Sequence, residues 1–184
     1  MNRASIVGIF GMAMLAWGLI SQIAMSQQKP LREQLVGTWA LVSWDQRNAD
    51  GTTVQRFGAN PMGIAFFDTT GHYIITVMRT DRAKYAIDNF GQIAQATAEE
   101  NKATAQGTIT YFGTYSVNEL DRTIAIHVEG SSFPNWNGTD QQRLFEITKD
   151  ELKLTVRPPR GAVLTSSGSG RNRLHARWAR PASL

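Results

Sequence analysis

The stretch HVEGSSFPNWNGT, residues 127–139, places a histidine and a glutamate two positions apart. Side chains two apart on a β-strand point to the same face, so His127 and Glu129 lie side by side if this stretch is extended. Histidine changes its charge near neutral pH, where general acid–base catalysis is most efficient. The pair, or His127 with a tyrosine, could therefore move a proton in an isomerisation, a cyclisation or a hydrolysis.

The same alternation leaves open which way this pair points. Ile124, Ile126 and Val128 form the opposite face of the strand. If these three pack in the core, His127 and Glu129 face water and His127 makes only a structural hydrogen bond. The catalytic hypothesis requires both side chains to face the interior.

Two tyrosines lie on the apolar face of a neighbouring candidate strand, residues 108–117. Tyr111 and Tyr115 stand on either side of Gly113 on that face, which we expect to be buried. Their phenols are therefore candidates for anchoring the polar group of a ligand. The alternative is ordinary packing with each hydroxyl at the surface.

Two arginines, Arg79 and Arg143, continue strand faces that are otherwise apolar. The residues that share these faces are Tyr73, Ile75 and Val77 for Arg79, and Phe145 and Ile147 for Arg143. A buried guanidinium needs a partner, because an unpaired buried charge is very costly. We expect Glu129 or a ligand carboxylate to be that partner, unless each arginine only covers the rim with its stem.

Several other kinds of site are excluded by the residues present. The three histidines, His72, His127 and His175, lack the spacing of a zinc site, and the chain has no cysteine for a metal or a disulfide. A glycine-rich phosphate loop and the Gly-x-Ser-x-Gly nucleophile motif are also missing. We therefore expect no metal and no cofactor.

The elements that must position these residues are short strands separated by turns. The strands predicted from alternation and turn composition are 37–44, 54–57, 63–67, 72–79, 108–117, 123–129, 143–148, 152–156 and 173–178. Short turns join antiparallel neighbours, so the pattern predicts an all-β, antiparallel barrel or sandwich.

One segment departs from this pattern. Thr97 and Glu100 fit a capping box, so an alanine-rich helix is predicted to run to about Gln106 and to end at Gly107. It has few large apolar residues to bury, so we place it across the mouth or flank of the barrel. Residues 158–170 are rich in Pro, Gly and Ser and are predicted to be a long loop.

The first residues have the order of an export signal. Arg3 is followed by an uncharged apolar run to Ile20, and small residues precede a cleavage point after Ser26. We expect a periplasmic or secreted protein with no stable membrane span after cleavage, or an N-terminal anchor if the signal is kept. The predicted organisation is a signal over 1–26, a short linker over 27–34 and one barrel domain over 35–180.

The charge of the chain does not indicate nucleic acid as a partner. The formal net charge is +4, and the late part of the chain carries much of the basic excess. Those arginines alternate with apolar residues and have no aromatic stacking platform around them. We interpret them as a solvated strand face with a basic loop.

The order of the motifs resembles a known family. The first strand, LVGTWALVSW, contains the Gly-x-Trp start that is typical of lipocalins, at Gly37 and Trp39. The stretches NPMGIAFFDTTGHYIITVMRTDR, YFGTYSVN, IHVEGSSFPNWNGT and RLFEITKDELKLT follow. This succession is similar to the lipocalin-like domain family of mainly bacterial proteins, over about Leu35 to Trp178. The resemblance implies one antiparallel β-barrel of about eight to ten strands around a cavity. It also implies that Trp39 closes one end under Arg177, but it implies no activity.

The sequence therefore predicts an exported lipocalin-like barrel that binds a small hydrophobic or amphipathic molecule in its interior. The apolar lining is expected from Phe66, Ile75, Val77, Phe145 and Ile147. The ligand-binding candidates are Arg79, Tyr111, Tyr115, His127, Glu129, Trp136 and Arg143, with a ligand carboxylate or enolate meeting an arginine. Two alternatives stay open: an enzyme on the same barrel that uses His127 and Glu129, and an envelope protein-interaction module that uses residues 158–170 and the late arginines.

Overall fold

The structure is a computed structural model that describes residues 29–48, 50–156 and 173–181. The helices are α1 (Leu31–Leu35), the 3-10 helix η1 (Phe90–Gln95), α2 (Ala98–Gln106) and the 3-10 helix η2 (Pro134–Trp136). The strands are β1 (Gly37–Arg47), β2 (Thr53–Val54), β3 (Met62–Phe67), β4 (His72–Met78), β5 (Thr108–Asn118), β6 (Thr123–Ser131), β7 (Asp140–Ile147), β8 (Glu151–Val156) and β9 (Arg173–Ala179). The predicted signal and loop 158–170 fall outside the described residues.

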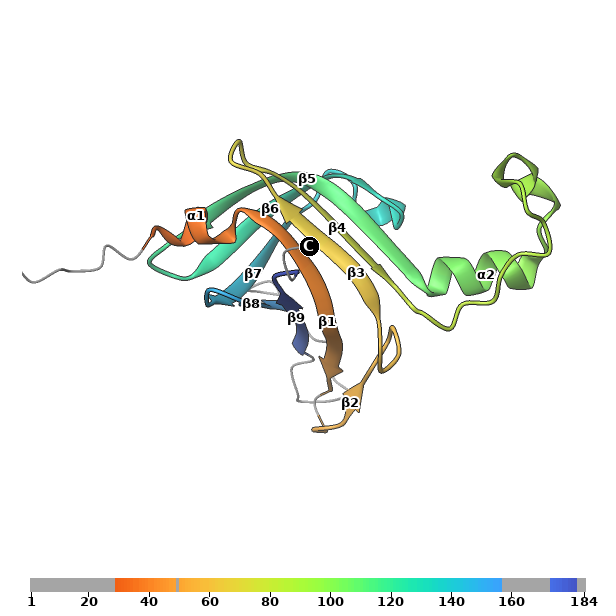
Figure 1. Ribbon diagram of the computed structural model, residues 1–184, viewed down its shortest axis with the longest axis horizontal. Helices are drawn as coiled ribbons and strands as arrows, with labels where there is room; N and C mark the ends of the chain where they lie inside the picture. Colours follow the sequence, from red (N-terminus) through yellow and green to blue (C-terminus); the bar gives the residue numbers. More distant parts are fainter. Residues whose placement is uncertain (1–28, 49, 157–172, 182–184) are drawn as a thin grey trace, which may run out of the picture.

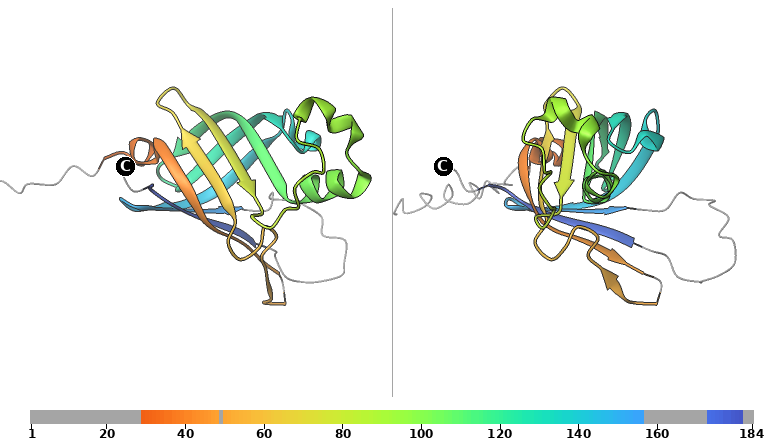
Figure 2. Two further views of the ribbon diagram at one scale, coloured as in Figure 1. Left: turned by 45° about the vertical axis from the view of Figure 1, so that its right-hand side comes forward. Right: turned by 90° about the vertical axis from the view of Figure 1, so that its right-hand side faces the viewer.

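The strands form one antiparallel sheet that closes on itself (Figures 1 and 2). From β3 onward each strand pairs with the next along the chain, β1 pairs with β3, and the last strand, β9, pairs with β1. The two-residue strand β2 only extends the end of β1. The predicted all-β antiparallel barrel is therefore confirmed. None of the helices in the described residues is long and apolar enough to cross a membrane.

One end of the barrel is closed by Trp39 and the helix α1. Trp39 is fully buried, and its indole N–H donates to the carbonyl of Leu35 at 2.8 Å. The guanidinium of Arg180 lies 4.2 Å above the indole ring. The prediction that Arg177 covers this ring is wrong: Ala176 and Trp178 take the inward positions of β9, so Arg177 faces outward and pairs with Glu151 at 2.9 Å.

The helix α1 was not predicted. Residues 31–34 of this helix fall in the stretch expected to be a linker, and Leu35 at its end is fully buried. The carboxylate of Glu119, in the turn after β5, accepts the backbone N–H groups of Leu31 and Arg32 at 3.0 and 3.2 Å. The first backbone N–H groups of this helix therefore find their hydrogen-bond acceptor in a residue far along the chain. A local sequence motif could not have indicated this contact.

One side chain of β3, that of Phe66, points to the opposite face from the one predicted. Ala65 and Phe67 are buried, whereas Phe66 points outward and is 44% exposed. Phe66 therefore does not line the interior. The sequence MGIAFF is apolar throughout, so alternation of polar and apolar residues could not set its phase. Ile75, Val77 and Phe145 are buried as expected, and Ile147 packs against the core.

The segment between β4 and β5 leaves the barrel at its open end (Figure 1). The predicted capping box is present: Thr97 and Glu100 satisfy each other's backbone amides, and α2 ends before Gly107. The last turn of α2, Ala105 and Gln106, lines the mouth of the pocket described below. The predicted helix is thus confirmed, but it does not lie across the mouth or flank: beyond its last turn it extends away from the barrel (Figure 1).

The turn between β3 and β4 is organised by Asp68. One of its carboxylate oxygens accepts the backbone N–H groups of Gly71 and His72, each at 2.8 Å, and the other accepts the Thr70 hydroxyl. The phenol of Tyr115 donates to the Asp68 carbonyl at 2.6 Å, which ties the turn to β5. The backbone N–H of His72 and the Thr70 hydroxyl together hold the pKa of Asp68 at about 2, below its ordinary value of 3.8.

This depressed pKa predicts a loss of stability in acid. The contribution of Asp68 is present above pH 3.8 and is lost as the pH falls through about 2, because the carboxylate is then protonated. We expect Asp68→Asn to unfold more readily than the wild type at pH 7 and to differ little from it at pH 2. Urea unfolding at both pH values measures this, with Asp88→Asn, an exposed residue outside the turn, as the control. An equal difference at both pH values would contradict the prediction.

Candidate functional site in the barrel interior

A pocket opens at the end of the barrel opposite Trp39. The residues that line its inner part are Trp44, Phe57, Ile109, Trp136, Gln141 and Arg143. They come from β1, the loop after β2, β5, η2 and β7, so closure of the sheet brings them together. This inner part is mostly apolar and aromatic, with polar groups from β7, whereas the rest of the lining is largely polar and includes Thr114, Ser116, Thr123, His127 and Asp140. The composition of the inner part is typical of sites for small molecules.

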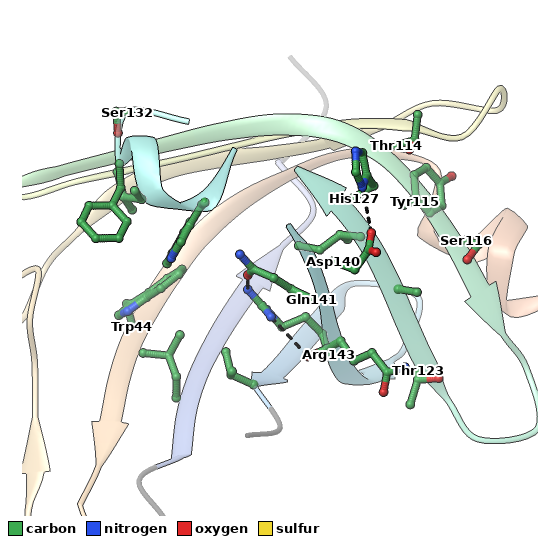
Figure 3. Close-up of a pocket in the computed structure, with 18 of the residues that line it drawn as sticks. Trp44, Thr114, Tyr115, Ser116, Thr123, His127, Ser132, Asp140, Gln141 and Arg143 are labelled. Atoms are coloured by element: carbon green, nitrogen blue, oxygen red, sulfur yellow. Dashed lines mark hydrogen bonds and ion pairs between the residues drawn. The ribbon is translucent and has the colours of Figure 1, made fainter. Parts of the chain in front are cut away.

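Arg143 is the charged residue that the described part of the chain buries. It shares the inward face of β7 with Phe145 and is 8% exposed. Its guanidinium donates to the side-chain oxygen of Gln141 at 2.5 Å and to the backbone carbonyl of Gln142 at 3.2 Å. Within the described ranges no carboxylate pairs with it. The interior thus holds a positive charge that is hydrogen-bonded but not neutralised (Figure 3).

Two buried phenols surround this charge. Tyr111 is 2% exposed, and its burial raises the pKa of its phenol, an effect that the nearby Arg143 partly opposes. Burial also raises the pKa of Tyr73, and the neighbouring phenol of Tyr111 raises it further. The Tyr73 hydroxyl has no hydrogen-bond partner among the described residues. Both phenols are therefore neutral at pH 7 and do not neutralise the arginine.

Aromatic rings extend from these phenols to the rim. The Trp136 ring meets Tyr111 edge to face, with centroids 5.3 Å apart, and Phe133 packs against Trp136 at 5.8 Å. Pro134 at the start of η2 fixes the turn that carries Trp136. The expectation that Trp136 folds over an opening agrees with this geometry.

Tyr115 lies toward the other end of the barrel, and its hydroxyl is used by the Asp68 carbonyl. Burial raises the pKa of Tyr115, and the Arg32 guanidinium opposes this shift. Of the two tyrosines expected to hold a ligand, Tyr111 lies beside Arg143, whereas Tyr115 lines the same pocket with its hydroxyl bound to Asp68.

His127 points away from the interior, whereas Glu129 is exposed at the register shift between β5 and β6 and lies near enough to Tyr73 to raise the pKa of that phenol. Ile124, Ile126 and Val128 take the buried face of β6, and the His127 side chain is 47% exposed. Its Nδ1 lies 2.8 Å from the carboxylate of Asp140 rather than near Glu129 (Figure 3). The catalytic hypothesis requires both side chains to face the interior, and His127 does not, although His127 and Asp140 belong to the exposed part of the lining of the pocket that contains Arg143.

Arg79 is also outside the site. β4 ends at Met78, and the backbone N–H of Arg79 donates to the carbonyl of Gly107, where the chain leaves the sheet. The alternation that placed Arg79 on the inward face stops at this point. Its guanidinium pairs with Asp81 through two contacts, at 2.8 and 2.6 Å, so Glu129 is not its partner.

Comparison with known proteins places this chain in a family. The family model described as a lipocalin-like domain matches residues 36–181, which is most of the chain. The chain belongs to the lipocalin-like domain family. The resemblance inferred from the motifs is thereby confirmed.

Similar individual proteins are distant. The chain is 34% identical over 74 residues to the 4'-hydroxy-3'-methoxypropiophenone carrier protein ppsC of Aspergillus oryzae, covering 36% of this chain and 67% of that protein. A lipocalin-like protein of Bacteroides uniformis has 16% identity and a TM-score of 0.40, covering 78% of this chain and 97% of that one. A redesigned β-barrel has 14% identity and a TM-score of 0.39, covering 83% and 96%.

Two residues of the site in this lipocalin-like barrel were not among the candidates predicted from the sequence. Gln141 lies two positions before Arg143, so it would share the same face if the strand were extended. The predicted strand began at Arg143, whereas β7 begins at Asp140. Tyr73 was placed on the inward face, but nothing in the sequence indicated that its hydroxyl would lack a partner.

Proposed function

We propose that this lipocalin-like barrel is an exported carrier of a small, largely apolar molecule whose anionic end binds Arg143. The observation that carries the proposal is the buried guanidinium of Arg143, which has no carboxylate partner in the described part of the chain. A buried charge is costly unless it is paired. An anionic ligand would complete the pair.

The lining indicates which kind of molecule fits. Trp44, Phe57 and Trp136 offer aromatic surface in the inner part of the pocket, and Tyr111 and Gln141 offer polar groups beside the guanidinium. Aromatic rings stack on such side chains, and a carboxylate, phenolate or enolate can accept hydrogen bonds from an arginine. We therefore expect an aromatic acid or an acidic phenol.

The similarity to the Aspergillus oryzae carrier protein supports this class. The name of that protein gives its ligand as a propiophenone with a hydroxyl and a methoxy group on the ring. Such a molecule combines an apolar aromatic body with a phenol that can ionise. The proposal for the present barrel rests on its own Arg143 and takes from that relative only the general class of ligand.

Export is part of the same proposal. It rests on the order Arg3, apolar run and small residues up to Ser26. A carrier in the periplasm or outside the cell would meet small molecules before they enter the cell. Acid–base catalysis is not proposed because His127 does not face the interior. The protein-interaction alternative depends on residues 158–170, which lie outside the described residues.

The test is native mass spectrometry of the protein purified from its own host. We expect a complex that is heavier than the chain by one small molecule, and release of an aromatic acid or phenol on denaturation. The mass of the denatured chain is expected to correspond to a start at Gln27. An apolar molecule without an acidic group would contradict the assignment to Arg143, and a chain that retains residues 1–26 would contradict cleavage.

A further inference from the structure

The outer surface of the barrel is divided into two unlike halves. On β6 to β9 the outward side chains include charged residues in ion pairs, such as Lys153 with Glu146 and Arg177 with Glu151. On β3, and on the stretches 74–78 of β4 and 108–112 of β5, the outward positions hold no charged residue. β1, β3, β4 and β5 follow one another in this order in the sheet (Figure 1).

This second half exposes an apolar surface, which we call the outer patch. Its members are large apolar side chains that are each 40–53% exposed: Val42, Met62, Ile64, Phe66, Ile74 and Phe112. Strand pairing aligns Phe66 with Ile74, and Ile74 with Phe112, so three of them form one row across three strands. The patch is therefore contiguous.

The polar groups inside the outer patch are already satisfied. The hydroxyls of Thr76 and Thr110 hydrogen-bond to each other at 2.7 Å. Covering these threonines therefore leaves neither hydroxyl without a partner, which lowers the desolvation cost. At one border Arg82 donates to the Thr108 hydroxyl at 2.8 Å, and at the other lies the polar turn of Asp68 and His72. An apolar centre with a polar rim is the usual arrangement of a protein interface.

The size and the charge of the patch indicate what covers it. Its six side chains expose on the order of 500 Å² of apolar surface, at the upper end of what monomeric proteins show. A stable interface covers about 800 Å² on each partner, which the patch with its threonines and rim can supply. Because the patch has no charge, two positively charged copies of this chain can meet there without placing like charges opposite each other.

We propose that the outer patch is a self-association surface on which a second copy of this chain docks through a two-fold axis. Each copy buries Ile64, Phe66 and Phe112 against the same residues or their neighbours in the other copy. The mouth of the barrel lies at the end of the strands and not on this face, so both pockets stay open. The dimer does not depend on the proposed ligand.

The first test is sedimentation equilibrium of the host-purified protein over a range of concentrations. We expect a monomer–dimer equilibrium in the wild type and a dissociation constant at least about a hundredfold higher for Ile64→Lys, because the symmetry opposes two new like charges. The matched control, Ala125→Lys, places the same charge on an exposed outward position of β6 and is expected to dimerise like the wild type. Thermal unfolding of each variant verifies that it is folded.

A second measurement does not require the protein to tolerate a new charge on this surface. The chain has no cysteine, so Ile64→Cys and Ala125→Cys each carry one thiol. A short bis-maleimide is expected to join two Ile64→Cys chains and not two Ala125→Cys chains. The proposal would be overturned by a wild type that stays monomeric or by a dimer that Ile64→Lys does not affect. It would also be overturned by the reverse cross-linking pattern, or by binding of the monomer to phosphatidylcholine vesicles through this face.

Discussion

Replacing Arg143 with methionine is expected to weaken the binding of an aromatic carboxylate by about 10- to 100-fold, which corresponds to the loss of one hydrogen bond to a charged group. Methionine keeps much of the apolar stem but removes the charge that would pair with the ligand. Isothermal titration with benzoate-type acids measures the change. The corresponding neutral alcohols are expected to lose little affinity, because they do not need a cation.

The same substitution has an opposite effect on the empty protein. Removing an unneutralised buried charge and filling its place with an apolar side chain is often neutral or stabilising. We therefore expect the free energy of unfolding of Arg143→Met to equal or exceed that of the wild type. Arg79→Met is the control, since Arg79 pairs with Asp81 outside the pocket. Equal affinity of both variants for the acid would refute the assignment of the anion site to Arg143.

The largest effect on stability is expected from Gly113→Ala. The register of β5 and β6 shifts at Gly113, and the two backbones come so close that a Cβ at this position would lie 2.0 Å from the carbonyl oxygen of His127 and 2.8 Å from the backbone nitrogen of Glu129. Backbone atoms in a closed sheet cannot rotate away. We expect the free energy of unfolding to fall by about 3 kcal/mol or more, at the severe end for one substitution.

Gly130→Ala is the matched control for this prediction. Gly130 lies opposite Phe112 in the same pair of strands, and the atoms nearest to a Cβ there would be those of the Phe112 ring, at 2.5 Å. That ring belongs to an exposed side chain and can rotate aside. Urea unfolding should therefore show a clearly smaller loss for Gly130→Ala. Similar stabilities of the two variants would contradict the close approach at Gly113.

The sequence predicted those parts of the fold that depend on local chemistry. The capping box at Thr97 and the turn of Asp68 to His72 depend on residues within four positions of one another, so both could be located. The faces of β6 had two interpretations, because alternation defines two sets of residues without saying which set is inside. Packing of Ile124 and Ile126 in the core decided between them.

The candidate site could be predicted only in part, for a related reason. Arg143, Tyr111 and Trp136 were identified because each lies in a recognisable strand or turn. Arg79 was wrongly assigned to the interior, because alternation along the strand does not show where β4 ends. That end is fixed by a hydrogen bond to Gly107, a residue far along the chain. Among the described residues Arg143 has no acidic partner, and this depends on how all the strands of the closed barrel are arranged. No single segment of the sequence could therefore have indicated it.

The contact of Arg180 with Trp39 has a consequence for how the chain folds. Arg180 donates to the carbonyl of Gln34 at 2.7 Å, and β9 pairs with β1, so the last described strand holds the first. Contacts of such large sequence separation form slowly, because a long loop must close first. Until β9 is present, β1 and β8 are both unpaired edges. A growing chain therefore cannot close its barrel before β9 has been synthesised.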